Sequence, residues 1–144
     1  VLDKENGILK FVPSGANYSE NNYLTGDEPD FSDSSAIAID GSIYVLFNDG
    51  AIKKFTKGAS DTFSVSGLSK PMSGPTRIFT GEDTDNIYVL DNGNSRVVVL
   101  GKDGKFQKAY SANVLKTAKD FDVDETGKKI LILSGGKIYQ IDIK

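Results

Sequence analysis

The chain has 144 residues and a formal net charge of −3, and this acidic balance argues against a nucleic-acid-binding surface, for which a basic patch is expected. It contains no His and no Cys, which excludes disulfides, imidazole or thiolate metal ligands, a serine triad and a thiol nucleophile. No apolar run is long enough to span a bilayer as a helix, and the length fits one domain better than two.

The first 35 residues begin with strand patterns and continue into the longest polar connection of the chain. Residues 1–3 have the pattern of the end of a strand, a turn follows at 4–6, and residues 8–12 predict the next strand. Residues 13–35 are rich in Asn, Ser, Asp, Gly and Glu, which predicts a loop. We expect an outer strand near 22–25 to interrupt this loop.

Residues 36–66 predict one unit of four short strands joined by tight turns. The strands are expected at 36–40, 43–47, 51–56 and 61–66. A second loop follows at 67–74. The two long loops carry large side chains that either form an adaptable binding rim or, as we favour, pack over strand edges. These side chains are Tyr18, Tyr23, Phe31 and Met72.

Residues 75–110 repeat this unit most clearly. The strands are expected at 76–80, 87–90, 96–100 and 105–110. Asp103-Gly104 is a strong signal for a two-residue hairpin, because a type I′ turn needs positive φ at both central positions. The outer strand of this unit is expected to pass through 112–117 into a last unit. Its strands are expected at 120–124, 129–134 and 137–143.

The acidic run at 120–127, DFDVDETG, has the pattern of the start of a calcium loop, in which oxygen ligands alternate along the backbone. A strand explains it better, because Phe121 and Val123 alternate with the acidic residues. Leu131 also stands where such a loop needs its closing Glu. We therefore predict an inner strand and no metal site.

The strand units recur at a steady period. The apolar run that starts at Ile43 precedes the one at Ile87 by 87 − 43 = 44 residues, and Ile130 follows Ile87 by 130 − 87 = 43. Val1-Leu2-Asp3 falls into the same register, so the chain opens inside a repeat. Units of four strands that recur every ~40 to 45 residues are typical of a β-propeller.

Residues 75–104, PTRIFTGEDTDNIYVLDNGNSRVVVLGKDG, resemble an NHL repeat. The pattern of that blade is Pro, an apolar inner strand, a turn, I-Y-V-x-D, N-x-R-V and a final D-G. The other repeats match more loosely. The resemblance implies an all-β fold, a β-propeller segment of about three and a half four-stranded antiparallel blades. Some NHL-type propellers are lyases that hold a metal with histidines, and this chain has no His.

The repeats divide the chain into a partial blade at 1–33, blades at 34–74 and 75–117, and a partial blade at 118–144. Propellers close with about four to eight blades, so these blades do not complete a ring. We favour a fragment of a longer protein, with a six-bladed ring as one expectation, because the chain begins without Met or a signal-like segment. The alternatives are two copies that form one ring and a short open stack with modified ends.

The most probable ligand surface of a propeller lies around its central channel, where the inner strands begin. Alignment of the inner strands places Arg77 and Asp120 at equivalent positions of adjacent blades, with Phe79 and Asp122 two residues further along their strands. We call these four residues the channel rung. We predict that Arg77 and Asp120 form an ion pair or share a ligand at the channel. A second polar group, Asp91, Asn94 and Arg96, is better explained as a turn cap with Arg96 paired to a neighbouring blade than as a ligand pocket.

The chain is therefore expected to be a non-enzymatic interaction or sensor module that binds a protein, peptide or small ligand at the channel face. We expect no catalytic residue, metal, cofactor, nucleic acid or membrane insertion. The expected partner is the remaining half of a propeller, from the same full-length protein or a second copy. The alternative is a hydrolase or lyase whose active site a missing segment completes. The compartment stays open, with an extracytoplasmic or cell-surface location in a bacterium favoured.

Overall fold

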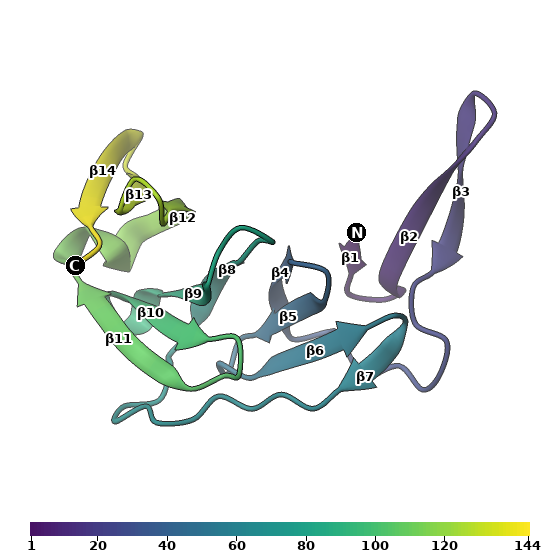
Figure 1. Ribbon diagram of the computed structural model, residues 1–144, viewed down its shortest axis with the longest axis horizontal. Helices are drawn as coiled ribbons and strands as arrows, with labels where there is room; N and C mark the ends of the chain where they lie inside the picture. The colour runs from purple at the N-terminus through teal and green to yellow at the C-terminus, as the bar shows by residue number, and fades with distance from the viewer.

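Each of the four sequence units folds into its own antiparallel sheet in the computed structural model, which describes residues 1–144. The sheets stand side by side along an arc, with the N-terminal sheet at one end and the C-terminal sheet at the other (Figure 1). The expected all-β architecture of antiparallel sheets is confirmed, with four strands in each of the two middle sheets and three in each end sheet.

The strand bounds follow the repeat closely. The first sheet consists of β1 (Leu2–Asp3), β2 (Gly7–Ser14) and β3 (Asn17–Asn22). The second consists of β4 (Ser34–Ile39), β5 (Ile43–Phe47), β6 (Ile52–Thr56) and β7 (Ala59–Asp61). The third consists of β8 (Pro75–Phe79), β9 (Asn86–Asp91), β10 (Arg96–Gly101) and β11 (Phe106–Ser111). The fourth consists of β12 (Ala118–Asp124), β13 (Lys129–Ser134) and β14 (Lys137–Asp142).

Strands β5 and β9 are the most deeply buried elements, because both of their faces carry apolar side chains. Successive side chains of a strand point to opposite faces, so each strand contributes to two interfaces between sheets. Leu46 packs in one cluster with Val89 of the third sheet, whereas Leu90 packs with Ile132 of the fourth. A third cluster joins the first two sheets. These three apolar interfaces hold the four sheets together.

The inner strands border the hollow of the arc (Figure 1). Strand β8 lies against β4 on one side and against β12 on the other. Two short segments of 3-10 helix connect strands, η1 (Asn92–Asn94) and η2 (Asn113–Thr117). The outer strand expected at 112–117 is therefore wrong, because η2 occupies these residues. Neither of these helical segments combines the length and the hydropathy that a membrane crossing requires.

The predicted bounds of the fourth strand of the second sheet, 61–66, are wrong. The chain reverses earlier, because Lys57 and Gly58 both have positive φ, at 51° and 81°, and form a two-residue hairpin turn. Strand β7 therefore ends at Asp61. The chain then crosses to the third sheet, where Ser66 forms a parallel bridge with Lys105.

The expected loop at 13–22 is also wrong, as is the outer strand near 22–25. Strand β2 continues to Ser14, and β3 returns from Asn17 after a turn in which Gly15 has a φ of 63°. This hairpin projects from the sheet (Figure 1), and every residue of β3 is exposed. The polar sequence of β3 shows no strand pattern, because backbone hydrogen bonds to β2, rather than an apolar face, hold the hairpin together.

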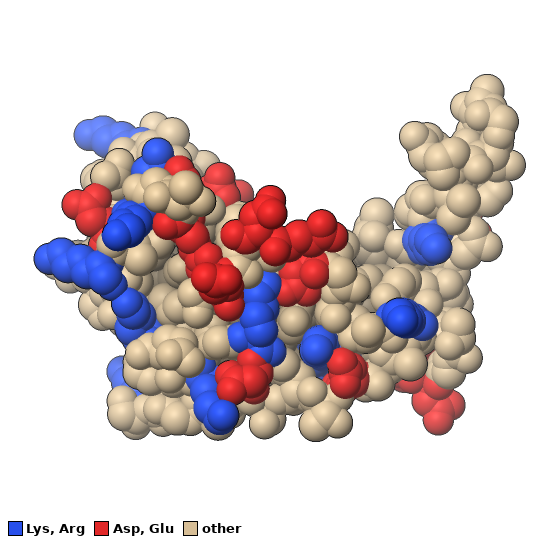
Figure 2. All heavy atoms as spheres, in the orientation of Figure 1, with Lys and Arg blue, Asp and Glu red and all other residues tan.

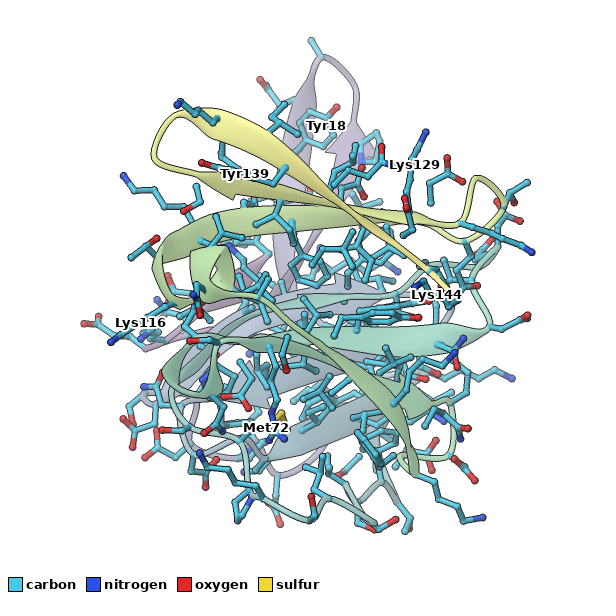
Figure 3. The ribbon with its side chains drawn as sticks, turned by 90° about the vertical axis from the view of Figure 1, so that its left-hand side faces the viewer. Tyr18, Met72, Lys116, Lys129, Tyr139 and Lys144 are labelled. Carbon is cyan, nitrogen blue, oxygen red and sulfur yellow. The ribbon has the colours of Figure 1, made fainter.

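The large side chains of the two long loops have different positions. Phe31 and Met72 are buried, and Phe31 stacks on Phe47 with ring centroids 6.4 Å apart. Figure 3 shows Met72 among the side chains between the sheets, whereas Tyr18 lies on the distant hairpin. Tyr18 is 70% exposed. Tyr23 is partly buried and packs against the apolar cluster between the first two sheets. Packing against the sheets is therefore confirmed for Phe31, Met72 and Tyr23 but not for Tyr18.

Candidate functional site

The predicted channel rung lies between the inner strands β8 and β12. The Nε atom of Arg77 lies 3.4 Å from Oδ1 of Asp120, and the two side chains are 45% and 61% exposed. Nη1 of Arg77 also donates to the backbone oxygen of Thr76 at 2.8 Å. Such an exposed ion pair contributes about 0–1 kcal/mol to stability. Because both side chains are exposed, their charged groups are accessible at the hollow of the arc.

The other two rung residues have separate surroundings. Phe79 is half-buried and packs against Phe121, with ring centroids 6.2 Å apart. Asp122 is exposed and accepts a hydrogen bond from the backbone N–H of Val123 at 2.9 Å. The structure thus brings Arg77 and Asp120 together and assigns Phe79 to an interface between sheets.

A shallow depression of about 280 Å³ lies on the outer face of the fourth sheet. Asp120 and Asp122 line it together with apolar residues of β13 and β14. Leu133 is 41% and Ile138 is 73% exposed. Two carboxylates therefore stand beside an uncovered apolar surface, which is suited to contact with another polypeptide or an amphipathic ligand.

The second predicted group forms a buried hydrogen-bonded cluster around Asp91. Oδ2 of Asp91 accepts bonds from Nε of Arg96 at 2.7 Å and Nδ2 of Asn94 at 2.8 Å, and Oδ1 accepts one from the N–H of Ser73 at 2.8 Å. The carboxylate that pairs with Arg96 belongs to its own sheet, whereas the contact of Arg96 with the neighbouring blade at 34–74 is made by hydrogen bonds to backbone oxygens. Arg96 does reach the preceding connection, where Nη2 donates to the backbone oxygen of Lys70 at 2.7 Å.

Two polar ties between sheets were not predicted from the sequence. Nζ of Lys102 donates to Asp40 and to Thr80 Oγ1, which joins the second and third sheets. Glu125 of the fourth sheet accepts hydrogen bonds from Asn86 Nδ2 at 2.9 Å and the hydroxyl of Tyr88 at 2.8 Å. Glu125 also accepts a hydrogen bond from the N–H of Asp85, 40 residues earlier in the chain. Asp40 and Thr80 are bonded at the same separation. Polar residues spaced by about one repeat are therefore the sequence signal that could have predicted these contacts.

These ties change the pKa values of buried groups. Burial raises the pKa of Glu125, but hydrogen bonds from Asn86 and Asp85 outweigh burial and hold that pKa below its ordinary value. Burial, and then the nearby Glu125, raises the pKa of Tyr88. Burial, together with Asp40, raises the pKa of Tyr44 to about 12. The carboxylate and the two phenols therefore keep their ordinary protonation states at neutral pH.

Acidic side chains gather around the hollow of the arc (Figure 2). No three His, Cys, Asp or Glu side chains come together in a group that could hold a metal ion.

Comparisons with known proteins identify the fold. No family model matches the chain, and no curated protein matches its sequence. A solved nidogen/laminin complex contains a chain similar to it, with a TM-score of 0.65, 11% identity, and coverage of 92% of this chain and 52% of that one. Virginiamycin B lyase from Staphylococcus aureus is similar with a TM-score of 0.53, 16% identity, and coverage of 98% and 50%.

A third similar structure is KlHsv2 with loop 6CD replaced by a Gly-Ser linker, with a TM-score of 0.54, 10% identity, and coverage of 77% of this chain and 36% of that one. This chain spans about half the length of the first two neighbours. At such low identity the likeness shows the fold alone. Together with the four antiparallel sheets around a hollow, it shows that the chain has the fold of a partial β-propeller.

Proposed function

We propose that this chain is a non-enzymatic interaction module, built from NHL-like blades, that binds a protein, peptide or small ligand at its concave face. The accessible Arg77 and Asp120 and the acidic side chains around the hollow support binding at this face. A second observation indicates a larger partner: the end sheets leave apolar surfaces uncovered. Ile138 and Leu133 are exposed on the fourth sheet, and Ile39 is 58% exposed beside the first. Soluble proteins normally cover such surfaces with a partner.

The partner that we propose for these end surfaces is the remaining part of a propeller ring, from the same full-length protein or from a second copy. A depression of about 350 Å³ lies between the first and second sheets and is lined mostly by apolar residues. The face of the fourth sheet that points away from the third is also partly apolar. A further blade stacked on the fourth sheet would bury that face as the three existing interfaces bury theirs, and a further strand beside β1 would cover the depression between the first and second sheets.

The state of the carboxylates supports binding rather than acid catalysis. A general acid at neutral pH needs a carboxyl group whose pKa is raised. Hydrogen bonds and nearby Lys residues instead lower the pKa values of Asp61, Asp103 and Asp124, each of which lies close to a Lys. These three carboxylates are paired with Lys side chains of the same chain and stay ionised, so none of them is suited to act as a general acid.

The mass of the protein in solution tests the proposed end surfaces. We expect light scattering to show either twice the chain mass of 15.5 kDa or, for the isolated chain, an apolar surface that binds a hydrophobic dye. Ile138→Asp is expected to abolish the larger mass or to reduce dye binding severalfold. Tyr18→Asp is the matched control, because this equally exposed residue lies on the projecting hairpin. A monomer that binds no dye would contradict the proposal.

A further inference from the structure

The second sheet is shorter on its outer side than the third. Strand β11 pairs with β10 from Arg96 to Leu100, whereas β7 pairs only with the end of β6 from Lys54 to Thr56. Positions in the two sheets correspond, because Ile43 pairs with Phe55 as Ile87 pairs with Leu100. The start of β6 therefore lacks the partner strand that its counterpart in β10 has.

The residues of β6 without an outer partner are Ile52 and Lys53. The N–H of Phe47 donates to the backbone oxygen of Ala51 at 2.9 Å, and antiparallel ladders alternate between bonded and non-bonded pairs. Lys53 therefore exchanges bonds with β5, and Ile52 directs its N–H and C=O to the outer edge. None of the backbone hydrogen bonds outside the ladders involves Ile52.

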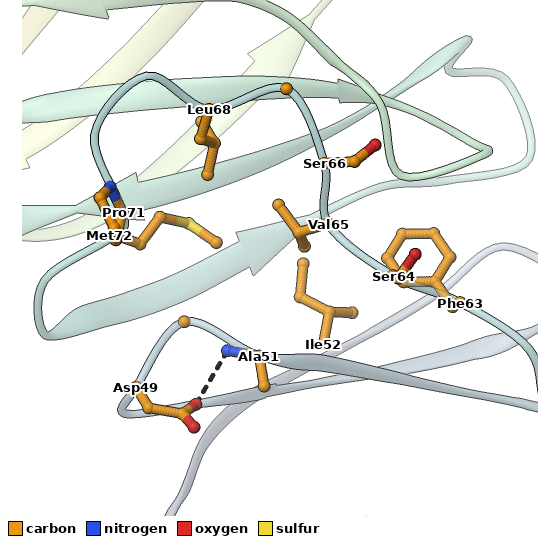
Figure 4. Close-up of a pocket in the computed structure, with 12 residues that line it drawn as sticks. Asp49, Ala51, Ile52, Phe63, Ser64, Val65, Ser66, Leu68, Pro71 and Met72 are labelled. Atoms are coloured by element: carbon orange, nitrogen blue, oxygen red, sulfur yellow. Dashed lines mark hydrogen bonds between the residues drawn. The ribbon is translucent and has the colours of Figure 1, made fainter.

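Two depressions flank this free edge. The first, of about 550 Å³, is lined by Ile52 and by side chains of the crossing segment, including Val65, Leu68 and Met72 (Figure 4). The second, of about 470 Å³, is lined by Lys53 among others. Successive residues of a strand point to opposite faces, so the depressions lie on opposite faces of the sheet. They meet at the edge, because Asp49 and Ala51 line both.

The two depressions differ in chemistry. Half of the twelve residues that line the first are hydrophobic. The second contains the carboxylates of Asp30, Asp33 and Asp49 against the single ammonium of Lys53. That ammonium lies over the ring of Phe47, 4.7 Å from its centroid, and the carboxylate of Asp33 accepts no hydrogen bond. The second depression is therefore complementary to an added positive charge.

We propose that the free edge of β6 binds an extended peptide as an added strand, with an apolar side chain in the first depression and a neighbouring Lys or Arg in the second. The backbone of Ile52 supplies the hydrogen bonds of strand addition. The alternation of side chains in the added strand then matches one apolar and one acidic depression. This site lies on the outer side of the sheet and is independent of the concave face discussed above.

A fluorescein-labelled peptide of sequence Gly-Ser-Thr-Lys-Leu-Lys-Thr-Ser-Gly provides the probe. We expect saturable binding to the full chain in fluorescence anisotropy. Replacement of both Lys residues of the peptide by Glu is expected to weaken binding at least tenfold, because they would then face like charges. N-methylation of the peptide Leu is expected to weaken it similarly, because it removes a backbone donor opposite Ile52.

Variants of the protein locate the site. Asp33→Asn is expected to weaken binding of the Lys peptide about threefold to tenfold, and it removes no hydrogen bond of the folded chain. Asp83→Asn is the matched control, since Asp83 is an equally exposed carboxylate on the third sheet. Saturation with the peptide is expected to slow hydrogen exchange of the Ile52 amide more than tenfold.

Two results would overturn this inference. Equal affinity for the Lys and Glu peptides, or for the Asp33→Asn and Asp83→Asn proteins, would show that the acidic depression selects nothing. An Ile52 amide that is already protected in the free chain and loses protection on dilution would show that a second copy, rather than a peptide, occupies the edge.

Discussion

Single side chains hold neighbouring sheets together at one end of the strands. The carboxylate of Glu125 receives three hydrogen bonds from the third sheet, and Lys102 joins the third sheet to Asp40 of the second. Charged hydrogen bonds of this kind contribute more than neutral ones when they are partly shielded from water. The stability of the interfaces therefore depends on a few polar residues as well as on apolar burial.

Glu125→Gln is expected to reduce the free energy of unfolding at pH 7 by about 1–2 kcal/mol, because the amide removes the negative charge and replaces one of the two acceptor oxygens with an NH2 group that faces a donor. The pKa of Glu125 is lower in the folded chain than its ordinary 4.5. Its contribution is thus present above about pH 4.5 and is lost as the pH falls through the lower folded-state value. Urea denaturation should show a smaller difference in the free energy of unfolding between wild type and variant at pH 3 than at pH 7. A difference that does not change with pH would contradict this account.

The sequence predicted some candidate residues and missed others for a physical reason. The alignment of inner strands placed Arg77 opposite Asp120 because both residues follow the repeat. The roles of Glu125 and Lys102 were missed, because each contacts a residue of the preceding sheet rather than its sequence neighbours. Whether the rung contacts a ligand stays a prediction.

At the scale of the element, turns decide where strands begin and end. The strands at 43–47 and 87–90 were predicted well, because four consecutive apolar residues need burial on both faces. The strand at 61–66 was placed too late, because Lys57 is an unusual residue for positive φ and gave no turn signal. Most of β2 was predicted as a strand, but its end and all of β3 were taken for a loop, because the pairing of β3 depends on backbone bonds that polar side chains do not reveal.

Gly58→Ala is expected to lower the free energy of unfolding by about 1–3 kcal/mol. Gly58 has a φ of 81°, and a Cβ there would lie 2.9 Å from the backbone oxygen of Tyr23. Gly41→Ala is the matched control, since φ is 99° but no atom lies within 4 Å of the added Cβ. Thermal denaturation should show a larger loss for Gly58→Ala, and equal losses would mean that the close approach has no effect.

At the scale of the whole molecule, burial decreases from the middle of the arc to its ends. The residues of β5 are all buried, as are nearly all of those of β9, whereas β3 is exposed throughout and β14 almost throughout. Stability in such stacked sheets comes from contacts between neighbours. The end sheets, each with one covered face, are expected to open more readily than the middle ones.

Hydrogen exchange of the free chain should show this gradient. Amides of β5 and β9 are expected to exchange at least a hundredfold more slowly than those of β3, because opening the middle sheets disrupts two interfaces. Uniform protection along the chain would show instead that the four sheets unfold as a single cooperative unit.

The segment that crosses from the second to the third sheet would hold the two halves of the protein together after a cut in the backbone. Ser66 donates to the backbone oxygen of Gly104 and accepts from the N–H of Phe106, at 3.1 and 2.9 Å. These bonds fasten the segment to the third sheet before the connection at 67–74 begins. A protease cut within that connection would therefore leave the severed end still anchored to its neighbour, and the nicked protein would keep both halves in one particle.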